Sequence, residues 1–192
     1  MGVGLDNIDV GACKARGVEV CPAIGANALS VAEYVIATAM ILLRGPAYFA
    51  TQDVLAGKWD RPRFGSGLEL AGRTMGVIGF GSIGQVVGAR ARAMGMDVIA
   101  YDALLPDDAA AWNDVRRVDL DSLIAQSDVI TLHCPRIPET IDLIDARRFD
   151  QMKRGAVLIN SARGGVVNEA ACAAALRSGR LVGAALDTLN IE

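Results

Sequence analysis

The sequence predicts an α/β domain: a doubly wound parallel sheet with helices on both faces. Two observations lead to this prediction. From residue 74 onward, short apolar segments of strand length alternate with segments of helix length, a pattern typical of a parallel sheet covered by helices. The first of these strands is followed by Gly79, Gly81 and Gly84 at G-x-G-x-x-G spacing, and then by an amphipathic run.

The residues ahead of this region predict two short elements and a long helix. The short elements are a helix around 10–16 and a strand at 18–21, before Pro22. Ser30 and Glu33 match a capping box, so a helix is expected from there to about Arg44, ended by a Gly-Pro pair. Because this helix is apolar nearly all round, it is expected either at a subunit or interdomain contact or as an ordinary core helix.

The remaining elements follow from hydrophobic periodicity. A further helical stretch is expected near 47–56, ahead of a polar loop that runs to residue 67. Strands are expected at 75–78, 97–101, 129–132, 156–160 and 183–186, and helices from the glycine loop to residue 94 and at 120–126, 146–152 and 169–178.

The three glycines predict a diphosphate site of the Rossmann type. Gly79 permits the tight turn, Gly81 lets the backbone approach the phosphates, and Gly84 allows close packing of helix on strand. The free N–H groups and positive dipole end of the helix, at Ser82 and Ile83, then face the anion. A glycine-rich loop in an unrelated α/β domain is the alternative interpretation.

The second strand ends in Asp102, 18 residues after Gly84, and this acid predicts the cofactor. A carboxylate there suits the adenosine ribose hydroxyls and repels a 2′-phosphate. Residues 103–106 offer no Arg or Lys that could hold such a phosphate. NAD is therefore favoured over NADP.

The residues that follow the later strands are candidates for chemistry, since ligands of such sheets bind beyond the carboxyl ends of the strands. Arg163, with Gly164 and Gly165 expected to leave room around its guanidinium, is suited to bind a carboxylate or to polarise a carbonyl, although a surface arginine is the alternative. His133 is expected to form a wall of the nicotinamide pocket rather than to donate protons. Asp187 is expected to hold a nicotinamide carboxamide, or else to cap a loop.

Composition excludes several other classes of protein. The net charge of −3 argues against nucleic acid or an anionic membrane as the main partner. The longest apolar run, 30–43, contains Glu33 and is too short to span a bilayer, and the N-terminus lacks a leader pattern, so a cytoplasmic location is expected. Four scattered cysteines predict reduced, mostly buried thiols, and with a single histidine no metal site is expected.

Seven ordered motifs give the chain a family resemblance. GVGLDNID, SVAEY, ELAGRTMGVIGFGSIG, VIAYD, LHCP, NSARGG and GAALD, in this order and spacing, resemble the D-isomer-specific 2-hydroxyacid dehydrogenases, and within them the phosphoglycerate dehydrogenases and their relatives. The resemblance covers essentially the whole chain. It implies reversible hydride transfer between NAD and the hydroxyl-bearing carbon of a D-2-hydroxy acid, and a homodimer, which the apolar run 30–43 also favours.

The resemblance also implies roles for single residues. Arg163 would be the catalytic arginine that holds the substrate's carboxylate and keto oxygen, and the backbone around Val3 and Gly4 would help to bind that carboxylate. Counting from Asp187 places the glutamate of the family's acid pair at Glu192. The cofactor would contact Ser82 and Ile83 with its diphosphate, Asp102 with its adenosine ribose, and Cys134, Ser161 and Asp187 with its nicotinamide half.

The resemblance further implies how the chain divides. Residues 1–24 would be a remnant of the substrate domain and crossover, residues 25–192 the NAD-binding domain, and most of the substrate domain would be missing. The partner histidine of the acid pair is expected about twenty residues beyond Glu192, so this chain alone is expected to bind NAD but to turn over poorly. Phosphoglycerate, hydroxypyruvate or glyoxylate, and sulfolactate all stay open as substrates.

Two other functions stay open. The chain could be a non-catalytic NAD-sensing or interaction module of the same fold, since the acid histidine is absent from it. A different Rossmann enzyme, for example one that binds S-adenosylmethionine, is a more remote alternative.

Overall fold

A six-stranded parallel sheet organises the chain in the computed structural model, which describes residues 4, 5 and 7–191. The strands run in the order β3-β2-β1-β4-β5-β6, and every pair is parallel. Their bounds are β1 Thr74–Ile78, β2 Asp97–Tyr101, β3 Arg116–Arg117, β4 Val129–Leu132, β5 Ala156–Asn160 and β6 Leu181–Leu186. The order reverses between β1 and β4, which places a ligand crevice at the carboxyl ends of these two strands.

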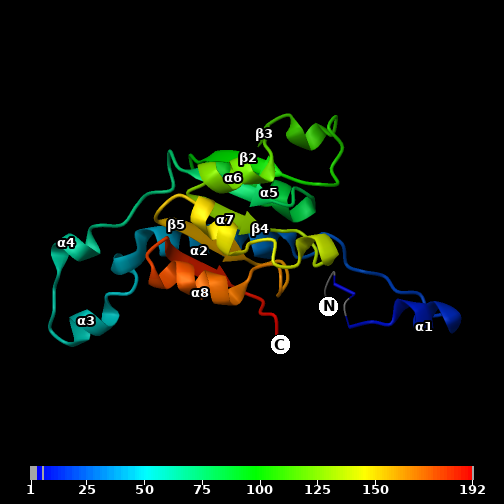
Figure 1. Cartoon of the computed structure of the whole chain (residues 1–192), viewed down its shortest axis with the longest axis horizontal. Helices are drawn as coiled ribbons and strands as arrows, with labels where there is room; N and C mark the ends of the chain where they lie inside the picture. The colour runs from blue at the N-terminus through cyan, green and yellow to red at the C-terminus, as the bar shows by residue number, and fades with distance from the viewer. Residues whose placement is uncertain (1–3, 6, 192) are drawn as a thin grey trace.

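Helices cover both faces of the sheet, as Figure 1 shows. One face packs against α2 (Ala28–Arg44) and α5 (Ser82–Ala93), and the other against α6 (Leu120–Gln126), α7 (Ala146–Gln151) and α8 (Glu169–Arg177). Short helical segments are α1 Val10–Ala15, η1 Gly45–Ala47, α3 Thr51–Leu55, α4 Arg61–Phe64, η2 Ala110–Trp112 and η3 Pro138–Thr140. The predicted fold class, a doubly wound parallel sheet, is confirmed.

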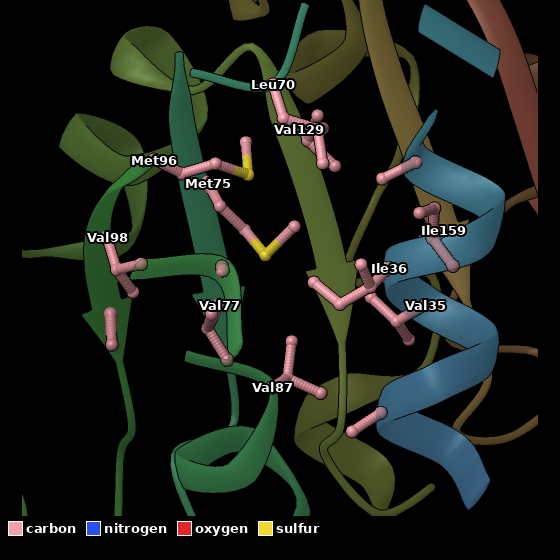
Figure 2. Packing of buried hydrophobic residues seen from close by; sticks show 14 of the residues in the cluster. Val35, Ile36, Leu70, Met75, Val77, Val87, Met96, Val98, Val129 and Ile159 are labelled. Atoms are coloured by element: carbon pink, nitrogen blue, oxygen red, sulfur yellow. The ribbon is translucent and has the colours of Figure 1, made fainter. Parts of the chain in front are cut away.

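The core explains why the central segments form strands. Every residue of β4 and β5 is buried, as expected for strands covered on both faces. Figure 2 shows Val35 and Ile36 of α2 directed toward the strands that carry Met75 and Val129. Burying each such side chain contributes about 1.5–3 kcal/mol, so this packing fixes the sheet and hence the positions of the strand ends.

The long apolar helix begins earlier than the sequence suggests. Helix α2 starts at Ala28 with Asn27 as its N-cap, and Ser30 lies inside it, so the predicted capping box is wrong. The helix is a core helix along the face that carries Ala32, Val35 and Ala39.

The stretch of residues 28–55, which contains α2, η1 and α3, is long and apolar enough to cross a membrane by length and composition alone. Core packing accounts for the apolar character of its first part, because α2 lies against α5 and the sheet. Helix α2 ends within this stretch, at Gly45, whose φ of 42° lies in the left-handed region.

Two predictions are wrong, and one strand was missed. Residues 18–21 form no strand, and β3, which pairs with β2, was not expected. Of the four free cysteines, Cys172 is buried but Cys21 is exposed, so the thiols are not mostly buried. Figure 1 also shows α1 at one end of the molecule and α3 and α4 at the other, all apart from the sheet.

Candidate active site at the carboxyl edge of the sheet

The loop after β1 has the geometry of a diphosphate cradle. Gly79 has a φ of 88°, and a Cβ added there would lie 2.7 Å from the backbone carbon of His133. A Cβ on Gly84 would lie 2.2 Å from the Gly79 oxygen, whereas one on Gly81 would meet nothing within 4 Å. Helix α5 starts at Ser82, next to Ile83, and no side chain caps its first amides. These amides and the open space beside Gly81 can accept a phosphate group.

Asp102 is fixed beside this loop by three backbone amides. Its Oδ2 accepts a hydrogen bond from Phe80 N at 2.7 Å, and its Oδ1 accepts from Leu104 N at 2.8 Å and Leu105 N at 2.9 Å. The carboxylate lines a cavity of about 530 Å³ together with Gly79, Gly81 and residues of the loop after β4. An anionic acceptor held in this way suits a pair of ribose hydroxyls.

His133 lies where the loop after β4 meets the glycine loop. Its backbone N–H donates to Ile78 O at 2.7 Å, and its Nε2 lies 3.0 Å from the Thr131 hydroxyl. Burial lowers the pKa of His133 from 6.5 to about 4, because the charged form loses hydration. The imidazole is therefore neutral at neutral pH and holds no proton that an acid catalyst could deliver there.

Cys134 follows His133 and lines two neighbouring cavities, the one beside Asp102 and a second, also of about 530 Å³. Burial, with a smaller contribution from the Asp102 charge, raises the pKa of its thiol to about 11. The thiol is therefore protonated and weakly nucleophilic, which suits a contact surface rather than a nucleophile. Within residues 4, 5 and 7–191, no cluster of three or more His, Cys, Asp or Glu side chains is arranged to hold a metal ion.

The loop after β5 positions Arg163. Asn160, which is 1% exposed at the end of β5, accepts from Ala162 N at 3.1 Å and donates to Arg163 O at 2.9 Å. The Arg163 Nη1 donates to Ala162 O at 2.7 Å. Arg163 lines the second cavity together with Ile83 from the diphosphate helix and with Gly4. A carbonyl compound in this cavity could therefore contact both the arginine and a bound dinucleotide.

The glycines after Arg163 have a different role from the one expected. The sequence suggested that Gly164 and Gly165 leave room around the guanidinium. A Cβ on Gly164 would instead lie 1.8 Å from the Leu189 oxygen, so this glycine permits contact with the segment after β6. That segment begins at Asp187, which is exposed and donates its backbone N–H to Asn160 O at 2.9 Å.

Unpaired polar atoms gather along this edge of the sheet. Within the described residues, the buried side-chain atoms without a hydrogen-bond partner are His133 Nδ1, Ser161 Oγ, Thr188 Oγ1 and Arg148 Nε. The first three follow β4, β5 and β6. Buried polar groups normally have partners, so their alignment beside the cradle fits a polar ligand that supplies those bonds. The residues present therefore fit NAD, with its amide and hydroxyl groups.

Two of the predicted site residues, Val3 and Glu192, lie outside the described residues. Sequence reasoning also missed two residues within them. Asn160 positions Arg163, and the signal was an amide side chain at the end of an otherwise apolar strand. Arg136 lines two cavities beside Arg163, and no pattern in the sequence set it apart.

The fold and this edge together define a dinucleotide-binding domain of the Rossmann type. Residues 36–192 match the family described as D-isomer specific 2-hydroxyacid dehydrogenase, NAD binding domain. The chain belongs to this family, which confirms the resemblance found in the motifs and the predicted cofactor, NAD.

Two proteins with similar sequences align with the whole chain. It is 47% identical to the (S)-sulfolactate dehydrogenase of Chromohalobacter salexigens, over 100% of the chain and 62% of that protein. It is 45% identical to the D-3-phosphoglycerate dehydrogenase of Archaeoglobus fulgidus, over 100% of the chain and 36% of that protein.

A solved structure of another dehydrogenase has a fold similar to that of this chain. The D-lactate dehydrogenase of Aquifex aeolicus, complexed with NAD and lactic acid, matches 99% of the chain and 56% of its own length, at a TM-score of 0.85 and 35% identity. The chain thus spans less than two thirds of the length of each of these three proteins.

Proposed function

We propose that this chain is the nucleotide-binding part of an NAD-dependent oxidoreductase that acts on the CH–OH group of a D-2-hydroxy acid, and on the 2-keto acid in reverse. The observation that carries the proposal is the shared cavity in which Arg163 and Ser161 lie together with Ile83 of the diphosphate helix. Residues 1–24 would belong to a substrate domain and crossover, and residues 25–192 to the NAD-binding domain.

The reaction divides into a hydride transfer and a proton transfer. When bound, NADH would supply a hydride, with its two electrons, for C2 of the keto acid, and a proton would add to the keto oxygen. Arg163 binds the carboxylate and the keto oxygen, and its positive charge stabilises the negative charge that develops on that oxygen. The backbone around Val3 and Gly4 would hold the same carboxylate.

The proton must come from another group than His133, whose pKa of about 4 leaves it neutral. A histidine outside this sequence, paired with Glu192, would have a pKa near the working pH, because a neighbouring carboxylate favours its charged form. We therefore expect this chain alone to bind NADH with little or no turnover.

The test is a screen of 2-keto acids with NADH on the longest natural form of the protein that contains this chain. Replacing Arg163 with Gln should lower kcat/KM by about a hundredfold or more, since the charge that stabilises the oxyanion is lost. The affinity for NADH should change less than threefold, and Arg154→Gln, at the opposite edge of the sheet, is the matched control. Full activity of the Arg163→Gln variant would exclude the proposed role.

The alternative is a non-catalytic module of the same fold that senses NAD. It is favoured by the neutral state of His133, the one histidine of the sequence. This alternative requires that the longest natural form also binds NADH but reduces none of the keto acids in the screen.

A homodimer is the oligomeric state that we propose. Large apolar side chains are exposed on the segment that carries η1, α3 and α4: Leu55 is 76% exposed and Trp59 is 71% exposed, and Phe49 lies nearby in sequence. Exposed aromatic residues on a segment apart from the sheet suit burial against a second copy. Light scattering should give a dimer, and Trp59→Ser with Leu55→Ser should shift it toward monomer; a monomeric wild-type protein would exclude the proposal.

We further propose a cytoplasmic location, supported by four free thiols, one of them exposed at Cys21. Cell fractionation tests this, and recovery outside the cytoplasm would contradict it.

A further inference from the structure

A second arginine shares the space around Arg163. Arg136 lies four residues beyond the end of β4, and Arg163 lies three residues beyond the end of the neighbouring strand, β5. Because the carboxyl ends of parallel strands meet at one edge of the sheet, the two loops lie together. Both arginines line the same two cavities, of about 490 and 530 Å³.

The guanidinium of Arg136 is held against the loop that carries Arg163. A Cβ built on Gly165 would lie 3.0 Å from Arg136 Nε and 3.2 Å from its Cζ, so the glycine makes room for the guanidinium. The Arg136 Nη2 also donates a long hydrogen bond, 3.4 Å, to Asn190 Oδ1. The guanidinium of Arg136 thus packs against Gly165, which lies two residues after Arg163 in the chain.

No carboxylate of the described residues forms an ion pair with Arg136. Within residues 4, 5 and 7–191, no carboxylate lies within 4.0 Å of its guanidinium, although seven other basic side chains form such pairs. The described residues that line the two cavities include neither Asp nor Glu. A small anion with two charged ends would meet one arginine at each end.

We propose that Arg136 is a specificity-determining residue that binds a second anionic group of the substrate, at the end away from the carboxylate held by Arg163. The preferred substrate is then a 2-hydroxy acid with a terminal tetrahedral oxyanion, a phosphate or a sulfonate. This inference rests on the proposed function, because Arg163 must hold the first carboxylate. A planar guanidinium with a fork of N–H donors is well suited to such an oxyanion.

The test compares keto acids that carry two anionic groups, called dianionic here although a phosphate group itself bears up to about two charges, with monoanionic keto acids. The longest natural form of the protein is used. Reduction by NADH is measured for 3-phosphohydroxypyruvate and 3-sulfopyruvate, and for pyruvate and hydroxypyruvate, which lack the second anion. Arg136→Leu should lower kcat/KM for the preferred dianionic keto acid by about tenfold to hundredfold, the effect of one charged hydrogen bond, mainly through KM. The two monoanionic keto acids should change less than threefold.

Two further variants sharpen the test. Arg136→Lys keeps the charge without the fork and should fall between wild type and Arg136→Leu, whereas Arg154→Leu, at the amino edge of the sheet, should match wild type. Comparing kcat/KM for 3-phosphohydroxypyruvate and 3-sulfopyruvate shows whether phosphate or sulfonate is the preferred group. An equal loss for dianionic and monoanionic keto acids, or no loss for either, would overturn the proposal.

A binding measurement separates this inference from the proposed function. Calorimetric titration of the NADH complex with 3-phosphoglycerate, with sulfolactate and with lactate needs no turnover. A wild-type protein that reduces no keto acid would defeat the proposed function. Tighter binding of a dianionic acid that Arg136→Leu abolishes would still support the role of Arg136, and equal binding of all three acids would overturn it.

Discussion

The carboxylate of Asp102 allows a quantitative prediction about cofactor binding. If its free lone pairs accept hydrogen bonds from the ribose hydroxyls, Asp102→Ala removes at least one charge-assisted bond, worth about 1.5–3 kcal/mol. This predicts that the affinity for NADH falls roughly tenfold to hundredfold. Isothermal titration calorimetry of wild type and variant measures the change directly.

Asp102→Ala should also lower the stability of the fold, because the carboxylate accepts hydrogen bonds from three backbone amides. The amides of Phe80, Leu104 and Leu105 lose their acceptor. Leu104 is 79% exposed and water can replace that bond, whereas Phe80 is buried and its unpaired amide costs about 1–3 kcal/mol. Thermal unfolding must therefore accompany the titration, so that binding is compared between folded proteins.

Asp102→Asn is the matched control, because it keeps an acceptor oxygen at the same length without the charge. It should be more stable than Asp102→Ala and should lose less affinity for NADH. Its relative affinity for NADPH should rise, since the carboxylate no longer repels the 2′-phosphate. A folded Asp102→Ala protein that binds NADH as tightly as wild type would refute the reasoning.

Three further predictions concern the glycine loop and the loop after β4. Gly84→Ala should lower the free energy of unfolding by about 1–3 kcal/mol because its Cβ meets the Gly79 oxygen, whereas Gly81→Ala should keep the fold and weaken NADH binding; equal melting temperatures would contradict this. Since the pKa of His133 falls from 6.5 to about 4 on folding, the unfolded chain binds a proton between those values that the folded chain does not. The free energy of unfolding should then drop by roughly 2 kcal/mol from pH 7 to pH 5 in urea titrations, and a drop of the same size in His133→Gln would exclude this cause. Iodoacetamide at pH 8 should modify the exposed Cys21 well before Cys134, whose pKa is about 11, and mass spectrometry that finds Cys134 labelled first would be the contrary result.

Local patterns in the sequence were sufficient to predict the central strands of the sheet and the glycine loop. The strands at 97–101, 129–132 and 156–160 have the predicted bounds, because buried apolar runs of this length leave a strand few alternatives. The glycine loop was equally clear, since its spacing reflects close contacts such as that of Gly84 with the Gly79 oxygen.

The errors arose where structure depends on partners distant in sequence. Arg116 and Arg117 form β3 only because β2 offers a free edge, and residues 18–21 have no strand beside them in the described chain. The start of α2 was misjudged because Ser30 and Glu33 imitate a cap inside the helix. Similarly, the close contact of Gly164 with Leu189 joins segments 25 residues apart and leaves no local pattern.

The candidate site was predictable only where its residues directly follow a strand. The residues after β4, β5 and β6 could be named once the sheet was known to be parallel. The support that Asn160 gives to Arg163 and the position of Arg136 beside it depend on loop geometry, which no periodicity encodes.

The most direct test of the central claim is a crystal structure of the protein soaked in NAD. We expect the diphosphate at the first amides of α5 beside Gly81, the adenosine ribose on Asp102, and the nicotinamide half near Ser161. An empty crevice in crystals that contain NAD at saturating concentration, or a dinucleotide bound elsewhere, would contradict the account.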